Sequence, residues 1–110
     1  MWQMTSRKEF VTYFYHTNFM GKQWTLPHEG KEGYIEESAG QVLGTKDGST
    51  VSGTSVVLQT KNESIRDDGQ MWLRGPADSY GWFTLKNTKS GKLLTRSLII
   101  LLQVAYIEGL

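Results

Sequence analysis

The stretch Gly69-Gln70-Met71-Trp72 decides how the rest of the sequence is interpreted, because an earlier part of the chain repeats its pattern. Trp24 lies 48 positions before Trp72. Tyr34 lies 48 positions before Trp82, and each of these two aromatic residues directly follows a glycine. A repeat of this length indicates a chain built from copies of one supersecondary unit that must pack against each other.

Each copy continues into a small-residue turn and an apolar pair, Ala39-Gly40-Gln41-Val42-Leu43 and Ser90-Gly91-Lys92-Leu93-Leu94, with three extra residues in the second copy. Short segments rich in aromatic and β-branched residues alternate with clusters of glycine, aspartate, asparagine and serine, which is the pattern of strands and turns. We expect strands at residues 10–15, 33–37, 41–43, 54–60, 70–73 and 82–86, and turns at 47–49 and 68–69. No segment before residue 97 has a convincing helical period. The sequence therefore predicts an all-β fold with short strands.

The order of these parts resembles the ricin-B-type (QxW) β-trefoil lectin family over residues 33–95. The unit has a small-residue turn at Ser38-Ala39-Gly40, a strand, a glycine-rich loop at 48–54, a second strand, and the closing Gln70-Met71-Trp72. The resemblance implies one β-trefoil domain spanning residues 1–110. It also implies an incomplete trefoil of about two units, since three units of 48 residues exceed 110. We expect Trp72 to anchor the core and Gln70 to bridge backbone groups of the loop.

The resemblance implies a carbohydrate-binding site formed by Asp47, Gln59, Asn62 and Gln70. Three positions depart from the sugar-binding members of the family: Gly44 stands where they carry an aspartate, Gln59 where they carry an aromatic residue, and Gly69 where an asparagine often precedes the Gln-x-Trp. Two functions are therefore considered. The first is a lectin-like module that binds a glycan or glycoprotein, and the alternative is a protein-interaction or scaffold module that has kept the trefoil and lost sugar binding.

Residues suited to catalysis or metal binding form no pattern in this sequence. There is no cysteine, and His16 and His28 have no second ligand at metal-binding spacing. Glu36 and Glu37 are adjacent, so on a strand their side chains point to opposite faces and cannot share a proton transfer. We expect no enzyme activity, no metal and no cofactor. An appendage of a catalytic domain is a third interpretation, and it is disfavoured because no linker precedes Met1.

Charge and hydropathy limit the partners and the compartment. The formal net charge is +1 and the charges are scattered, so we expect no nucleic-acid partner. The most apolar run, at 98–107, is shorter than the roughly 20 residues that a spanning helix needs, so we expect no membrane span. The chain has no cysteine and no signal-peptide pattern at its start, and we therefore expect a cytoplasmic location.

The apolar tail at 97–110 matches no part of a third unit. Three roles are considered for it. It could add a strand or short helix that closes the open side of the core. It could belong to a truncated product with an exposed apolar surface. Alternatively, chains could associate as homo-oligomers that complete the barrel.

Overall fold

The computed structural model describes residues 24–79, 81, 83–96 and 105–109, and within these ranges the protein is all-β, as predicted. Two 3-10 turns, η2 (Lys46–Gly48) and η3 (Asp68–Gln70), lie among the strands. The strands are β1 (Trp24–Thr25), β2 (Glu32–Gly33), β3 (Glu36–Glu37), β4 (Gln41–Thr45), β5 (Ser55–Thr60), β6 (Trp72–Arg74), β7 (Leu85–Asn87), β8 (Leu93–Arg96) and β9 (Ala105–Glu108).

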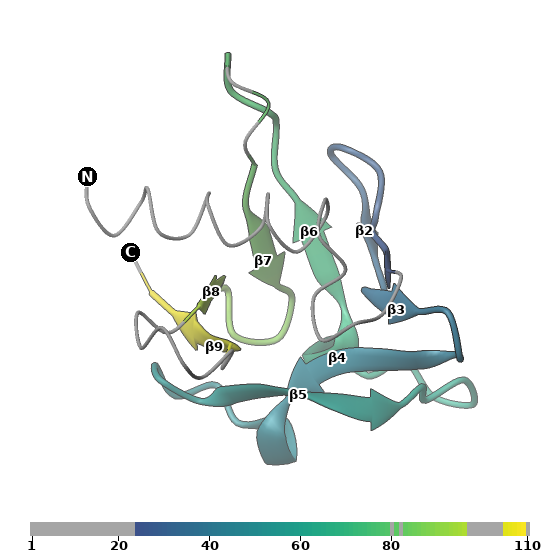
Figure 1. Cartoon of the computed structure of the whole chain (residues 1–110). Coiled ribbons are helices and arrows are strands. Elements are labelled where there is room, and N and C mark those ends of the chain that lie inside the picture. Colours follow the sequence, from purple (N-terminus) through teal and green to yellow (C-terminus); the bar gives the residue numbers. More distant parts are fainter. Residues whose placement is uncertain (1–23, 80, 82, 97–104, 110) are drawn as a thin grey trace.

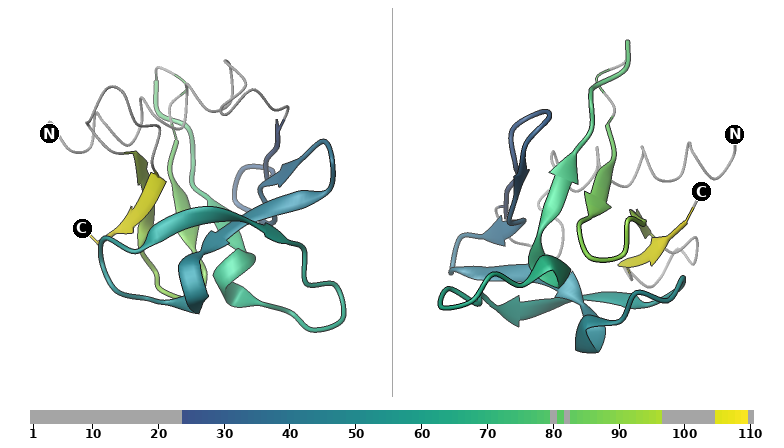
Figure 2. Two further views of the ribbon diagram at one scale, coloured as in Figure 1. Left: turned by 60° about the horizontal axis from the view of Figure 1, so that its bottom comes forward. Right: turned by 180° about the vertical axis from the view of Figure 1, so that it is seen from behind.

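All nine strands join one antiparallel sheet in the order β1-β3-β4-β5-β9-β8-β7-β6-β2. The sheet curls into a half-barrel: the β4–β5 hairpin runs across one end of the upright β6–β7 hairpin (Figure 1). Figure 2 shows the same crossing from below and from behind. Its two edge strands, β1 and β2, are joined in sequence by residues 26–31, so the curl brings the two ends of the sheet toward each other.

The two copies of the sequence repeat adopt the same strand pairing. In the first copy Trp24 pairs with Glu37, and in the second Trp72 pairs with Asn87. The next pairing corresponds as well, because Glu36 pairs with Val42 in the first copy and Lys86 pairs with Leu93, which the repeat matches to Val42, in the second. These pairings agree with the alignment of the two copies as far as the apolar pair.

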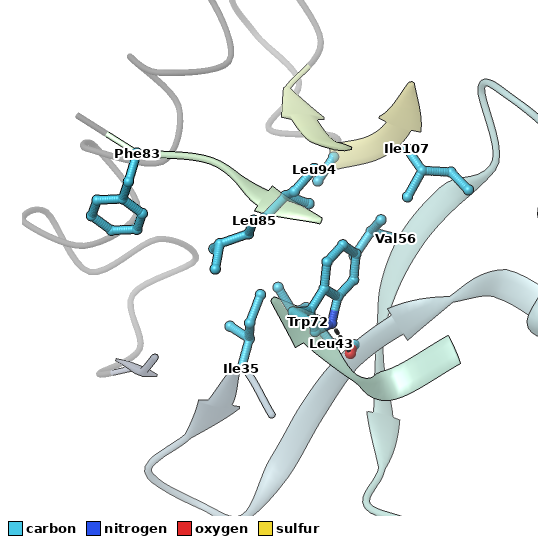
Figure 3. Close-up of a cluster of buried hydrophobic side chains, with 9 residues drawn as sticks. Ile35, Leu43, Val56, Trp72, Phe83, Leu85, Leu94 and Ile107 are labelled. Atoms are coloured by element: carbon cyan, nitrogen blue, oxygen red, sulfur yellow. Dashed lines mark hydrogen bonds between the residues drawn. The ribbon is translucent and has the colours of Figure 1, made fainter. Parts of the chain in front are cut away.

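The core forms where the two copies meet, around Trp72, which is fully buried. Its indole N–H donates a hydrogen bond to the Leu43 carbonyl oxygen at 3.0 Å, so the one polar atom of the ring is paired (Figure 3). The prediction that Trp72 anchors the core is confirmed. Trp24 is half-buried and packs against the same cluster, whose buried members are Ile35, Leu43, Val56, Trp72, Phe83, Leu85, Leu94, Ala105 and Ile107.

The small-residue turns of the two copies are built alike. The Glu37 carboxylate accepts a hydrogen bond from the Gln41 backbone N–H, and the Asn87 side-chain oxygen accepts one from the Ser90 N–H. Each turn ends at a glycine in the left-handed region, Gly40 at φ 99° and Gly91 at φ 71°. Glycine adopts this region without the steric penalty that a Cβ brings. A buried polar side chain at the end of a strand therefore organises the turn that follows in both copies.

The C-terminal part of the tail forms β9, which pairs with both β5 and β8. It joins the two copies by direct strand pairing, as in the first of the three roles considered above, for residues 105–108. Ala105 and Ile107 bury their side chains in the core. Residues 97–104 and 110, the predicted strand at 10–15, and Trp82 lie outside the described residues.

Several predicted boundaries were wrong. The expected strand at 33–37 is two short strands separated by Tyr34 and Ile35, because β2 pairs with β6 whereas β3 pairs with β1 and β4. Gln70 lies in η3 rather than in the following strand. β8 was not expected as a strand, although its apolar pair was part of the repeat. The bounds of these strands therefore depend on pairing partners that are distant in sequence.

Candidate functional site

Three of the four residues expected to bind carbohydrate lie together where β5 ends. The Gln70 side-chain oxygen accepts a hydrogen bond from the Asn62 backbone N–H at 3.0 Å. The Gln70 amide nitrogen donates to the Thr60 carbonyl and to the Gln59 side-chain oxygen, both at 3.0 Å. Gln70 is 4% exposed. It bridges backbone groups of the loop as predicted, and burial leaves it no surface for a ligand.

Gln59 fills the space beside Gly44. Its amide nitrogen donates to the Thr45 carbonyl at 3.0 Å, and its oxygen accepts the bond from Gln70. A Cβ at position 44 would overlap the Gln59 side-chain oxygen and would stand 2.9 Å from its Cδ. Gln59 therefore occupies the space that a side chain at position 44 would fill.

Asp47 takes no part in the hydrogen bonds that join the other three residues. It is exposed on η2 and adopts a left-handed backbone conformation, with φ 55°. Within the described part of the chain, no hydrogen bond or ion pair joins the Asp47 carboxylate to Gln59, Asn62 or Gln70. An exposed carboxylate on a turn interacts mainly with water.

A second group of side chains surrounds Asn62. The Tyr34 hydroxyl donates to the Asn62 carbonyl oxygen at 3.2 Å. The Lys61 ammonium lies 4.6 Å from the centroid of the Tyr34 ring and 3.2 Å from a Glu36 carboxylate oxygen. Glu36 comes from β3, and the pairing of β3, β4 and β5 places Glu36 and Gln59 on either side of Val42. We call Tyr34, Glu36, Lys61 and Asn62 the Tyr34 cluster.

The Tyr34 cluster is preorganised and partly open to solvent. The side chains of Lys61 and Glu36 are 25% and 33% exposed, and Tyr34 and Asn62 are half-buried. The hydrogen bond to Glu36 raises the pKa of Lys61, so its ammonium stays charged. Asn62 is held through its backbone on both sides, and in the part of the chain that the structure describes its side-chain amide makes no hydrogen bond. That amide is available to a ligand.

The sequence pointed to Asn62 but missed its neighbours. Tyr34 and Glu36 lie in the segment expected as one strand, and nothing local in that segment links either residue to Asn62. The signal that links Tyr34 and Glu36 to Asn62 is the pairing of β3 with β4 and of β4 with β5, which depends on contacts about 25 residues apart, such as Lys61 with Glu36.

The described residues were also compared with the requirements of a metal site and of a membrane-spanning helix. Among the described residues no group of histidine, aspartate and glutamate side chains could hold a metal ion. No helix in the same part of the chain is long and apolar enough to cross a membrane. A scan against protein-family models and searches of curated proteins and of solved structures find no match to this chain.

Proposed function

We propose that this chain is a non-catalytic glycan-binding module, a partial β-trefoil of the ricin-B-like lectin type. The corresponding strand pairings of the two copies, β1 with β3 and β6 with β7, then β3 with β4 and β7 with β8, support the trefoil repeat. The roles of Gln70 in closing the loop and of Trp72 in the core support the likeness to the QxW motif.

The Tyr34 cluster is the observation that carries the glycan proposal. Sugar sites combine an aromatic ring, against which the apolar face of a pyranose packs, with planar polar groups that bind hydroxyls. The cluster places a tyrosine ring, a carboxylate and an unpaired amide within one surface. It thus contains both groups that Gly44 and Gln59 do not provide, an aromatic ring and a carboxylate.

Binding on a glycan array, followed by titration of the best ligand, tests this proposal. We expect Asn62→Ala and Glu36→Gln each to weaken binding by about tenfold or more, since each removes a hydrogen bond to the ligand worth about 1.5 kcal/mol. Asp47→Ala is the control and should leave affinity unchanged, because among the described residues no hydrogen bond or ion pair joins Asp47 to the cluster. The proposal fails if no glycan binds, or if only Asp47→Ala abolishes binding.

A protein-interaction or scaffold role is the second candidate, and the filling of the Gly44 position by Gln59 favours it. In that case the repeat retains its packing while the position used for sugar is closed by internal hydrogen bonds. A purified protein partner whose affinity is unaffected by an excess of competing sugars would support this role over the glycan role.

A further inference from the structure

The Lys61 ammonium occupies the positions that a ligand would use in the Tyr34 cluster. It covers the ring of Tyr34 at 4.6 Å from the centroid and pairs with Glu36 at 3.2 Å. A cation is attracted to the negative face of an aromatic ring and, separately, to a carboxylate. The cluster is therefore a site for an ammonium group, and in the free protein the chain's own lysine fills it.

This observation restricts the class of glycan. A neutral sugar that packs on the Tyr34 ring must displace the Lys61 ammonium. The Tyr34 ring and the Glu36 carboxylate then both lack a cation. A sugar with a free amine can place its own ammonium between the ring and the Glu36 carboxylate while its hydroxyls reach the Asn62 amide. An N-acetylated sugar lacks the charge and cannot make this exchange.

We infer that the Tyr34 cluster recognises amino sugars that carry a free ammonium group, such as oligomers of glucosamine, and that Lys61 competes with them for the site. The inference rests on the glycan-binding function proposed above and names its ligand class. Lys61 is a specificity-determining residue, because its presence excludes ligands that cannot replace a cation.

The ring should keep its orientation when Lys61 is removed. The Tyr34 hydroxyl is held by the Asn62 carbonyl, and the Asn62 backbone N–H is held by the buried side chain of Gln70. Neither contact involves the lysine side chain. Lys61→Ala therefore leaves a ring and a carboxylate in place with no cation between them. Since an exposed cation–π contact and an exposed ion pair together correspond to about tenfold in affinity, we expect about tenfold tighter binding of a free-amine ligand to Lys61→Ala.

The experiment follows the Tyr34 ring protons by NMR during titration of the full chain at a pH below the pKa of the sugar amine. The probes are tetramethylammonium ion, the glucosamine trimer and the N-acetylglucosamine trimer. The proteins are wild type, Lys61→Ala, the double variant Lys61→Ala/Glu36→Gln, and Lys46→Ala as a control that removes an exposed lysine on η2. Circular dichroism of each variant verifies that the fold is retained.

We expect the glucosamine trimer and tetramethylammonium to shift the Tyr34 signals of Lys61→Ala, with weaker effects on wild type and Lys46→Ala and little effect on the double variant. Equal binding of both trimers would overturn the ammonium preference and leave glycan binding intact. Absence of any shift in Lys61→Ala with tetramethylammonium would overturn the ammonium site itself, whatever the glycan array shows. Glycan binding as such fails separately, when the array is silent for wild type and Lys61→Ala alike.

Discussion

Individual side chains in this protein form hydrogen bonds with backbone groups at the ends of strands. Gln59 donates to the Thr45 carbonyl at the end of β4, and Gln70 binds the Thr60 carbonyl at the end of β5 and the Asn62 N–H in the loop that follows, so two glutamines pair backbone groups where these strands end. Buried polar groups without a partner are costly, and these amides prevent that cost. At the residue scale, the hydrogen bonds of Gln59 both stabilise the fold and hold its side chain in the space beside Gly44.

Gly44→Ala tests the contact between Gly44 and Gln59. The added Cβ would overlap the Gln59 side chain, so we expect a loss of about 1–3 kcal/mol in the free energy of unfolding. In a Gln59→Ala background the same substitution should cost clearly less, because the obstructing side chain is gone. Urea denaturation of the four proteins in this double-mutant cycle gives the coupling. Additive losses would show that Gln59 does not occupy the space beside residue 44.

Trp72→Phe removes the indole N–H that is paired with the Leu43 carbonyl and leaves a cavity in the core. We expect a loss of about 2–4 kcal/mol in the free energy of unfolding, measured by circular dichroism in urea. Leu73→Ala is the comparison, since Leu73 is the next residue along β6 and is 38% exposed. Its loss should be well under half that of Trp72→Phe. Similar losses for the two variants would contradict the placement of Trp72 at the centre of the core.

At the scale of elements, the repeat preserves strand pairing more closely than side-chain chemistry. Glu37 and Asn87 occupy matching places before the two small-residue turns, and both accept a backbone hydrogen bond there. The turn needs an acceptor and a left-handed glycine, and either a carboxylate or an amide can supply the acceptor. This explains why the repeat is visible in the sequence through its glycines and aromatic residues rather than through its polar residues.

Gly40→Ala and Gly91→Ala should therefore have similar effects. Nothing lies within 4 Å of a Cβ added at either position, so the cost comes from the left-handed backbone alone. We expect each to lower the free energy of unfolding by about 1–2 kcal/mol. Gly33→Ala is the control, because an added Cβ there makes ordinary contact at 3.5 Å with Pro27 and the backbone is not left-handed. A large effect at only one of the two turns would argue against equivalent copies.

An exposed network ties β2 to η3 and to the turn after β7. Glu32 accepts a hydrogen bond from the Thr88 hydroxyl at 2.5 Å and pairs with Arg66, which also contacts Asp68 at 2.5 Å. The hydrogen bond from Thr88, followed by that from Arg66, lowers the pKa of Glu32. A carboxyl whose pKa is lowered by folding stabilises the protein above its unfolded pKa, and the contribution is lost as the pH falls through the folded value.

The expected effect on stability is small because the pair is exposed. Wild type should lose stability between about pH 5 and pH 3 more steeply than Glu32→Gln, whose side chain does not titrate. Thermal unfolding of both proteins across this range measures the difference, and above pH 6 the two curves should run parallel. A parallel course at low pH as well would show that Glu32 gains nothing from its partners.

At the scale of the whole molecule, the sequence was sufficient for the all-β class, the repeat and the role of the QxW motif. It was insufficient for the contacts that form the Tyr34 cluster. The core position of Trp72 and the backbone hydrogen bonds of Gln70 could be predicted because both residues belong to a motif with a fixed place in the repeat. The contacts of Tyr34 and Glu36 with Lys61 and Asn62 depend on the pairing of β3 with β4 and of β4 with β5, which brings together residues that no local pattern connects. The pairing of β9 between β5 and β8 likewise depends on a long-range register and not on the apolar composition of the tail.

The central claim is that ligand binding takes place at the Tyr34 cluster and not at the position closed by Gln59. Chemical-shift mapping of the ¹⁵N-labelled chain with a glycan selected from the array tests it most directly. We predict that the largest shifts fall on the backbone amides of Tyr34, Lys61 and Asn62, while those of Gly44 and Asp47 change little. Shifts concentrated at Gly44 and Asp47, with the Tyr34 cluster unaffected, would contradict the account.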